Sequence, residues 1–430
     1  MTCATVGSRG MVQTGQGPAD GSSGDRNGVL HPQRSGWKRV RLFLLRLLGQ
    51  ALRVLSPLLS RAYSSPTHPP SSILVIRPDH LGDLLFLGPA LRRLRKTFPS
   101  ALITLYAGPW DQQVAERLPH VDEVITCPFP GFERQPRGSL LAPYRLWLQE
   151  ARKLYRRRYD VALVMRCDHW WGAALAALAG IPRRLGYDLP EVRPFLTLAS
   201  AYTPGGHEVQ QNLVLTSSLD PEREETAEPI GDSEAGELTF ASTDSEKAWA
   251  KHWLLLQEAV LERPLVAIHP GAGAAVKLWV ADGWAEVADA LAERRGALIV
   301  LTGSASELDL VWAIASRMRT DPLIACGETT LGQLAALYGR CRLVIGPDSG
   351  PLHLAVAVGT PSLHLYGPVD SLTFGPWGER YRHRVITSDW TCVPCNHLDI
   401  AAAELVAHRC VREITASRVL AEAEALLAGR

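Results

Sequence analysis

Residues 73–83 read ILVIRPDHLGD, and the fold class can be inferred from this segment and its surroundings. Its first four residues are a short apolar run, which is typical of a buried parallel strand. A polar turn follows, and residues 84–98 then carry apolar side chains at helical period. A strand, a polar turn and a helix in this order predict the first unit of a doubly wound α/β sheet.

The same alternation continues along the chain in two series. In the first series we expect strands at 73–76, 101–106, 121–125 and 161–165 and helices at 84–98, 110–118, 144–156 and 171–179. In the second series we expect strands at 265–269, 297–302, 323–325, 343–345 and 362–366 and helices at 282–294, 306–318, 331–339, 351–358 and 415–428. The two series predict two Rossmann-like domains, at 71–217 and 246–430, with a ligand cleft at the carboxyl ends of their strands. The acidic stretch 218–245, poor in large apolar residues, is predicted to link them.

Composition limits the class of protein. Of the 430 residues 46% are hydrophobic and 21% charged, which is typical of a soluble globular protein with two or three domains. Lysine and arginine number 45 and aspartate and glutamate 44, so the formal net charge of +1 excludes a strongly basic nucleic-acid binder. Eight cysteines scattered through a long chain are unlike a small secreted disulfide scaffold and indicate a reducing cytoplasm.

The N-terminal arm, residues 1–70, differs from the rest. Residues 1–63 carry nine lysines or arginines and two aspartates, a net charge of +7, so the remainder carries −6. Residues 1–35 are poor in apolar side chains and are predicted to be disordered, and a proline-containing linker ends the arm. Residues 36–56 have leucines at helical intervals and an arginine every seven residues, which predicts a basic amphipathic helix. Such a helix suits an anionic membrane surface; the alternative is that it packs on the body of the protein.

Two carboxylates follow the first strand. Asp79 and Asp83 lie just beyond its carboxyl end, and therefore at the edge of the predicted cleft. A carboxylate in this position can act as a general base once the cleft closes. Asp83 is equally suited to cap the N-terminus of the following helix, and Asp79 competes equally for the role of base.

A Gly/Ala-rich loop follows the first strand of the second series. Residues 269–279 read HPGAGAAVKLW, and such a loop leaves backbone N–H groups open to phosphate oxygens, with Lys277 adding a point charge. Val276 replaces the third glycine of a dinucleotide fingerprint, and no G-K-[ST] sequence follows. The sequence of this loop is consistent with a phosphate-binding loop and with an ordinary turn.

Residues 346–354 read GPDSGPLHL and again combine a strand, a tight turn and a helix. Pro351 suits a first helical position, so the N–H groups near Ser349 and Gly350 would lie at the positive end of a helix dipole. A diphosphate can dock there without a metal. Asp348 would then bind sugar hydroxyls, or cap the helix.

Other polar side chains are expected to have structural roles. His353 lies on an apolar helix face and is expected to be a packed, hydrogen-bonded core residue rather than a catalyst. Cys392, Cys395 and Cys410 have histidines nearby, but no second C-x-x-C follows, so a buried thiol cluster is expected rather than a metal site. The chain contains no D-x-D sequence, which argues against a metal-held nucleotide-sugar site, and no G-x-S-x-G nucleophile elbow.

Several motifs together resemble glycosyltransferase family nine, the ADP-heptose-type heptosyltransferases of lipopolysaccharide core synthesis. The similar stretches are, in chain order, ILVIRPDHLGD at 73–83, GPDSGPLH at 346–353, GTP at 359–361, LYGP at 365–368, CVPC at 392–395 and HRC at 408–410. The likeness runs from about residue 73 to about the C-terminus. It implies a GT-B fold, which is two Rossmann-like domains with the active site between them.

The resemblance also implies a mechanism. The reaction would be inverting and would need neither metal nor cofactor, and Asp83 would take the proton from the acceptor hydroxyl as that oxygen attacks the anomeric carbon. The implied donor contacts are Lys277 on the departing diphosphate, Asp348, Ser349 and Gly350 on sugar hydroxyls and phosphates, Glu307 on the ribose and Thr329 beside the base. Some relatives carry threonines where this chain has GAG at 271–273, so here the loop offers backbone donors only.

The implied function is transfer of a heptose or related sugar from an ADP-activated donor to a lipopolysaccharide-core or other lipid-linked glycan. We expect the protein in the cytoplasm, with residues 36–56 as its contact to the inner face of the membrane. One alternative is a two-domain nucleotide-sugar epimerase, which would need no acceptor. Another is a non-catalytic nucleotide-sugar-binding protein, against which the presence of Asp83, Lys277 and Asp348 argues.

Overall fold

The computed structural model describes residues 35–59, 69–132, 142–220, 236–257 and 262–429. The described residues from 45 onward form one compact unit that contains both sheets, and residues 35–44 are not part of it. The predicted disorder of residues 1–35 falls almost wholly outside the described residues. The same holds for 221–235, the middle of the predicted acidic linker.

The first sheet has six parallel strands in the order β3-β2-β1-β4-β5-β6. Its strands are β1 (Ser72–Arg77), β2 (Leu102–Ala107), β3 (Glu123–Thr126), β4 (Val161–Val164), β5 (Arg183–Tyr187) and β6 (Leu198–Ser200). The predicted strand at 73–76 is thus the inner strand β1, which pairs with β2 and β4. The sequence pattern did not predict β5 and β6, because β5 opens with two arginines and β6 has only three residues.

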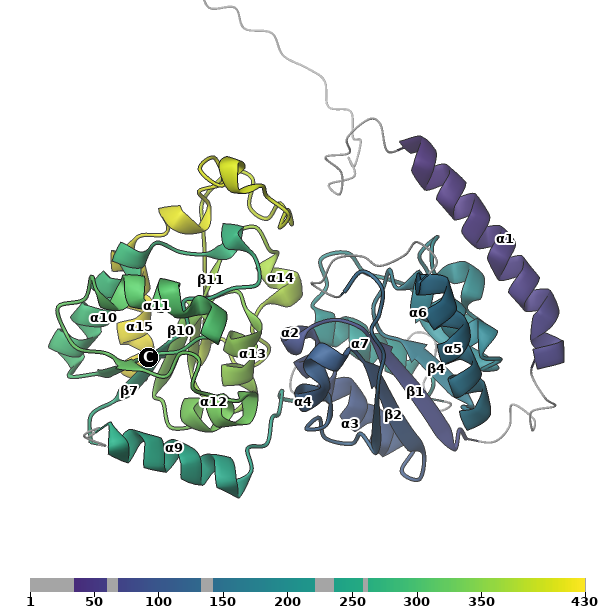
Figure 1. Cartoon of the computed structure of the whole chain (residues 1–430), viewed down its shortest axis with the longest axis horizontal. Coiled ribbons are helices and arrows are strands. Elements are labelled where there is room, and N and C mark those ends of the chain that lie inside the picture. Colours follow the sequence, from purple (N-terminus) through teal and green to yellow (C-terminus); the bar gives the residue numbers. More distant parts are fainter. Residues whose placement is uncertain (1–34, 60–68, 133–141, 221–235, 258–261, 430) are drawn as a thin grey trace, which may run out of the picture. The chain divides into compact units, whose positions relative to one another are not determined.

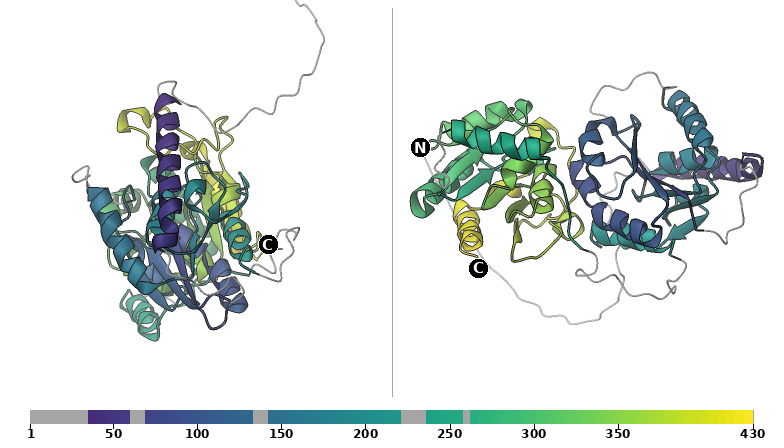
Figure 2. Two further views of the ribbon diagram at one scale, coloured as in Figure 1. Left: turned by 90° about the vertical axis from the view of Figure 1, so that its right-hand side faces the viewer. Right: turned by 90° about the horizontal axis from the view of Figure 1, so that it is seen from below.

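Helices cover both faces of this sheet (Figures 1 and 2). They are α2 (Leu81–Leu85), α3 (Gly88–Thr97), α4 (Gln112–Ala115), α5 (Ala142–Arg157), α6 (Trp170–Leu178) and α7 (Glu208–Ser217), with short 3-10 turns η2 (Pro109–Asp111) and η3 (Arg193–Phe195). Ile73 and Val75 of β1 pack in the core with α3 and α7, whereas Leu74 and Ile76 pack in the core with α5 and α6. This alternation is the two-sided burial expected of a parallel strand.

The prediction of one helix over 84–98 was wrong. The chain forms α2, a turn at Phe86 and Leu87, and then α3. Pro89 lies in the first turn of α3, and proline has no N–H to continue a preceding helix, so the first helix ends before it.

The second sheet also has six parallel strands, in the order β12-β11-β10-β7-β8-β9. They are β7 (Leu265–Ile268), β8 (Leu298–Leu301), β9 (Leu323–Ile324), β10 (Leu343–Pro347), β11 (Ser362–Tyr366) and β12 (His383–Thr387). Five of them occur where the sequence predicts strands. The sixth, β12, lies at the sheet edge and is only partly buried, and its sequence HRVIT lacks a clear apolar run.

The helices of the second half begin with α9 (Asp244–Leu256), which a capping box of Thr243 and Glu246 starts. The others are α10 (Ala281–Arg295), α11 (Leu308–Ala315), α12 (Leu331–Tyr338), α13 (Gly350–Ala357), α14 (Ser371–Phe374) and α15 (Ala416–Leu427), with 3-10 turns η4 (Ala275–Lys277), η5 (Ala305–Glu307), η6 (Ala402–Glu404) and η7 (Val411–Glu413). Helix α13 packs against α2 of the first half, so the two halves are in direct contact.

Helix α1 (Ser35–Leu59) confirms the helix predicted for residues 36–56. Leu45 and Leu52 lie on the same face of the helix, about two turns apart. Both are buried in the core that also contains α5 and α6. Gly49 lies against η3, where an added Cβ would come within 2.5 Å of the Cβ of Pro194. Leu47, on another side of the helix, is 47% exposed. Among the described helices, none is long and apolar enough to cross a membrane.

Candidate active site

A cleft of about 1660 Å³ lies where the strands of both sheets end. The first half contributes the loops after β1, β2 and β4, and the second half the loops after β7, β8, β9 and β10. This is the position predicted for the ligand cleft of a doubly wound fold. The cleft is lined by seven of the residues singled out from the sequence for catalysis or donor binding: Asp83, Lys277, Glu307, Thr329, Asp348, Ser349 and Gly350. Asp79, the competing candidate for the base, does not line it.

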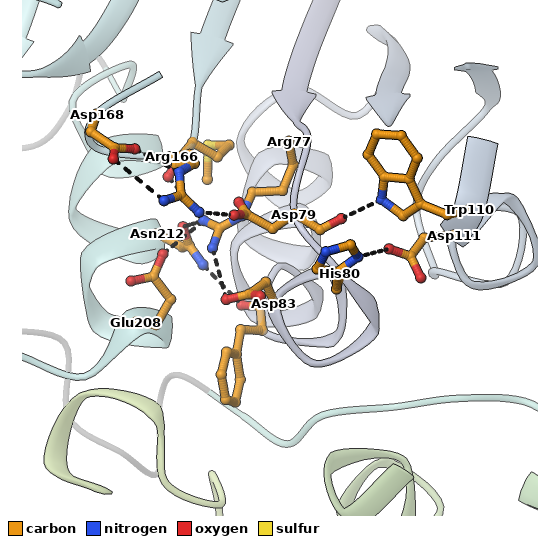
Figure 3. A network of polar contacts seen from close by, with 12 residues as sticks. Arg77, Asp79, His80, Asp83, Trp110, Asp111, Arg166, Asp168, Glu208 and Asn212 are labelled. Carbon is orange, nitrogen blue, oxygen red and sulfur yellow. Dashed lines mark hydrogen bonds and ion pairs between the residues drawn. The ribbon is translucent and has the colours of Figure 1, made fainter. Parts of the chain in front are cut away.

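Asp79 and Asp83 have very different surroundings (Figure 3). The side chain of Asp79 is 2% exposed, whereas that of Asp83 is 29% exposed and lines the cleft. Asp79 is held by two guanidiniums, with Arg77 Nε at 2.5 Å and Arg166 in close contact. Of the two carboxylates, only Asp83 is therefore in a position to reach a substrate.

Burial alone would raise the pKa of Asp79, but the charges of Arg77 and Arg166 outweigh it and hold the pKa below its usual value. For Asp83 the balance is reversed. Burial and then the neighbouring charge of Asp79 raise the pKa of Asp83 to about 7, against a smaller opposing effect of Arg77. A carboxylate with a pKa near neutrality is suited to accept a proton at physiological pH.

Asp83 does not cap helix α2. The N-cap residue is His80, which makes no side-chain cap bond, and Asp83 lies inside the first turn. Its Oδ1 instead lies 3.3 Å from Arg77 Nη2. The alternative role of helix cap is thus wrong, because the helix starts at Leu81, two residues before the aspartate.

On the opposite side of the cleft, Lys277 pairs with Asp348. Lys277 ends η4, directly after the Gly/Ala loop, and its Nζ donates to Asp348 Oδ2 at 2.8 Å. His353 Nε2 lies 3.8 Å from Asp348 Oδ1. Burial would raise the pKa of Asp348, but the contacts with His353 and Lys277 hold it well below its usual range. Asp348 therefore stays ionised. It does not cap α13, because the N-cap residue of that helix is Ser349.

The N-terminus of α13 opens into the cleft. Ser349 is the N-cap residue, Gly350 is the first helical residue and Pro351 the second, one position later than predicted. The Oγ of Ser349 is buried and makes no hydrogen bond to any residue that the structure describes. A buried hydroxyl without a partner beside a helix N-terminus can bind an anionic ligand.

Glu307 belongs to the loop after β8 and lies against the Gly/Ala loop that follows β7. Its Oε2 accepts hydrogen bonds from Ser304 N at 2.7 Å and Ser304 Oγ at 2.8 Å. A Cβ added to Gly271 would lie 1.7 Å from Glu307 Oε1, so a larger residue at this point would push the carboxylate aside. Thr329 lines the same part of the cleft and precedes Thr330, the N-cap residue of α12.

His353 is more than a core residue. It is buried as expected, and its ring packs edge-on against Phe86 at 4.8 Å between ring centroids. However, it also lines the cleft and contacts Asp348, and a Cβ on Gly82 would lie 2.9 Å from its Cδ2. The prediction that His353 is packed in the interior is confirmed. The sequence did not show that the face of α13 that carries His353 contacts the first half of the protein.

Sequence patterns do not single out Arg77, Arg166 or Glu208, although these residues surround Asp79 and Asp83 (Figure 3). For Arg77 a signal exists, since a charged residue ends an otherwise apolar buried strand. Glu208, 131 positions away from Arg77, carries no such local signal.

The cysteine cluster is less buried than predicted. Cys410 is buried, Cys395 is half-buried and Cys392 is exposed, because the segment that carries Cys392 runs along the surface. Within the described ranges, no group of three His, Cys, Asp or Glu side chains is arranged to hold a metal ion.

Comparison with known proteins agrees with this architecture. The solved structure of a family 9 glycosyl transferase from Veillonella parvula superposes with a TM-score of 0.68 at 24% identity, covering 84% of this chain and 98% of that one. The structure of Escherichia coli ADP-heptose LPS heptosyltransferase II gives a TM-score of 0.61 at 24% identity, covering 83% and 98%. At this identity the likeness concerns the fold, and it confirms the predicted GT-B arrangement.

Sequence comparison identifies the family. The chain is 28% identical over 368 residues to lipopolysaccharide heptosyltransferase 2 of Escherichia coli, covering 83% of this chain and 98% of the relative. The family model for glycosyltransferase family 9 (heptosyltransferase) matches residues 147–402, more than half of the chain. The chain therefore belongs to glycosyltransferase family 9, the heptosyltransferases, and is a glycosyltransferase.

Proposed function

We propose that the protein transfers a heptose, or a related sugar, from an ADP-activated donor to a lipopolysaccharide-core or other lipid-linked glycan, with inversion at the anomeric carbon. The observation that carries this proposal is the opposition, within one cleft, of Asp83 on one side and the Lys277–Asp348 pair with the N-terminus of α13 on the other. The likeness to the Escherichia coli heptosyltransferases described above supports heptose as the sugar and ADP as the carrier.

In the proposed reaction Asp83 is the general base. Its carboxylate accepts the proton of an acceptor hydroxyl while that oxygen forms a bond to the anomeric carbon. The bond between this carbon and the diphosphate oxygen breaks, and its electron pair leaves with ADP. Attack from the side opposite the leaving group inverts the anomeric configuration, which suits a base and a diphosphate site on opposite walls.

The donor is proposed to bind on the second half of the cleft. The backbone N–H groups at the start of α13, the hydroxyl of Ser349 and the ammonium of Lys277 would bind the diphosphate and stabilise its growing charge. These groups supply the positive charge from the protein itself, which is the basis for proposing a metal-independent reaction. Asp348 would hold sugar hydroxyls, Glu307 the ribose and Thr329 the edge of the base.

The proposal is tested by incubating the purified protein with ADP-heptose and a truncated lipopolysaccharide acceptor and following ADP release and product mass. Asp83→Ala should abolish transfer and leave ADP binding nearly intact, and full activity in this variant would refute the general-base role. Conversion of the donor alone to an isomer would favour the epimerase. Donor binding without any ADP release, with every acceptor tried, would favour a binding protein.

We also propose that α1 attaches the protein to the inner face of an anionic membrane. Arg39, Arg41 and Arg46 are exposed on this helix. The exposed large apolar side chains of the same helix are Val40, Phe43, Leu44 and Leu47. Apolar side chains flanked by arginines are typical of a helix that lies in a membrane surface. The two alternatives weighed from the sequence are compatible, since Leu45 and Leu52 pack on the body while other sides of the helix stay exposed.

A further inference from the structure

The guanidinium of Arg77 is shared among three carboxylates (Figure 3). It lies 2.5 Å from Asp79 through Nε, 2.7 Å from Glu208 through Nη1 and 3.3 Å from Asp83 through Nη2. The side chain of Arg77 is 2% exposed, so its guanidinium is shielded from water. The contact with Asp83 is the longest of the three, and Asp83 therefore receives the weakest share of the positive charge.

Glu208 is held in place by the helix that it begins. It is the first residue of α7, and the preceding residue, His207, caps the helix by accepting a hydrogen bond from Val209 N at Nδ1. Since Nδ1 is an acceptor, the ring proton is on Nε2, which lies 3.0 Å from the carbonyl oxygen of Gly375 and donates to it. The ring also packs against Trp377, with 4.7 Å between ring centroids. The turn that carries Glu208 thus touches the second half of the protein.

We propose that Glu208 is a positioning residue for the reaction: by occupying Arg77 it keeps the Asp83 carboxylate loosely paired and able to accept a proton, and His207 ties this arrangement to the second half. The inference rests on the proposed role of Asp83 as general base.

The charged and titratable groups that act on Asp83 come from both halves: Arg77, Asp79, Arg166 and Glu208 from the first and Tyr366 from the second. His353 of the second half lies against Gly82, the residue next to Asp83. Burial and Asp79 raise the pKa of Asp83 most, Arg77 lowers it, and Glu208 raises it. Without the Glu208 charge, Arg77 Nη1 would lose its carboxylate partner and the guanidinium could pair more closely with Asp83. Asp83 would then bind a proton less tightly and be a weaker base.

The test is the pH dependence of kcat/KM for heptose transfer by the full-length protein. Asp83 is active when deprotonated, so kcat/KM should fall as the pH drops below the pKa of Asp83. This fall is the acidic limb of the pH profile. In Glu208→Gln, which keeps the shape of the side chain but not its charge, this limb should move to lower pH by about one unit, and activity at high pH should fall. Glu208→Asp, which keeps the charge, should return the limb toward its wild-type position.

Glu150→Gln is the matched control. Glu150 is also a buried carboxylate of the first half, bonded to Tyr106 and Lys153, but it does not line the cleft. Its substitution should leave the limb in place. A purely structural role of Glu208 would lower activity equally at every pH, and a limb that stays in place in Glu208→Gln would overturn the proposal.

His207→Asn tests the link to the second half. Asparagine can still cap α7 but is too short to reach Gly375, so Glu208 should be held less firmly and the limb should shift in the same direction by less than in Glu208→Gln. An unchanged limb would remove His207 from the proposal. Failure of the general-base role is recognised separately, because Asp83→Ala would then remain active or the wild type would show no acidic limb.

Discussion

Lys277 and Asp348 form an ion pair inside the cleft, with 2.8 Å between Nζ and Oδ2. Their side chains are 14% and 9% exposed, so the pair is largely shielded from solvent. The contact joins the loop after β7 to the loop after β10. It places a positive and a negative charge next to the N-terminus of α13, where the diphosphate and the sugar of the donor are proposed to bind.

Removing Lys277 should therefore affect both stability and donor binding. In Lys277→Met, Asp348 loses the only lysine or arginine that pairs with it in the described part of the chain and keeps His353 and Tyr366 as partners. We expect a loss of about 1–3 kcal/mol in the free energy of unfolding at pH 7. Urea unfolding and ADP titration measure the two effects. Lys247→Met, which removes an exposed partner of Asp244, is the control and should change neither. Unchanged stability and unchanged ADP affinity in Lys277→Met would contradict the role of the pair.

Gly271 should be required for donor binding. In Gly271→Ala the new Cβ would overlap Glu307 Oε1 and push the carboxylate away from its hydrogen bonds to Ser304. If Glu307 binds the ribose, ADP affinity should fall by roughly tenfold, as expected for one lost hydrogen bond to a charged group. Gly88→Ala, where no atom lies within 4 Å of the added Cβ, should bind ADP like the wild type. Calorimetric titration gives both values, and equal affinity in the two variants would count against a ribose contact.

Asp83 should lower the stability of the folded protein at neutral pH and above. Its pKa is raised to about 7, above the value of 3.8 expected in the unfolded chain. The folded state thus holds the proton more tightly, and the stability that Asp83 contributes below pH 3.8 is lost as the pH rises through 7. Asp83→Asn, which cannot ionise, should therefore unfold at a higher temperature than the wild type at pH 8, by about 2 °C or more.

The same comparison at a lower pH is the control. Near pH 4 the aspartate is protonated in the folded protein, so the wild type and Asp83→Asn should unfold at similar temperatures. Scanning calorimetry at both pH values measures the difference. A variant that is less stable than the wild type at pH 8 would show that the carboxylate is not raised in pKa by its surroundings.

The exposed apolar residues of α1 should control membrane binding. Replacing Phe43 and Leu47 with glutamate removes two apolar side chains and adds negative charge, and each such side chain is worth about 1.5–3 kcal/mol when buried. Binding to vesicles of phosphatidylethanolamine and phosphatidylglycerol should fall by more than about tenfold, and added salt should weaken the wild-type binding. Transfer to a soluble acceptor should persist.

Leu256→Glu, at an exposed position of α9, is the matched control and should sediment with the vesicles like the wild type. Deletion of residues 1–44, which leaves Leu45 and Leu52 in place, should also weaken vesicle binding without destroying soluble catalysis. Equal sedimentation of the α1 variant and the wild type would refute the membrane contact.

Local patterns in the sequence predicted most of the fold. The apolar runs at 73–76 and 362–366 predicted strands that the structure contains, because a buried parallel strand needs a short run of apolar side chains with turn residues at its ends. The same rule missed β5 and β12, whose runs are broken by arginine or histidine. Strand β12 lies at the edge of its sheet and is only partly buried, whereas β5 is buried and was missed because it opens with two arginines.

The location of the site residues could also be predicted from the sequence, because the carboxyl ends of parallel strands meet at one edge and Asp83, Lys277 and Asp348 all follow strands. The role of each carboxylate there depends on contacts that form only in the folded protein. Asp79 and Asp83 are four positions apart and looked equivalent, yet one is closed in by two arginines and the other faces the cleft. The residues that bury these carboxylates and the charged residues near them, such as Glu208, are distant in the sequence. Local periodicity carries no information about such contacts.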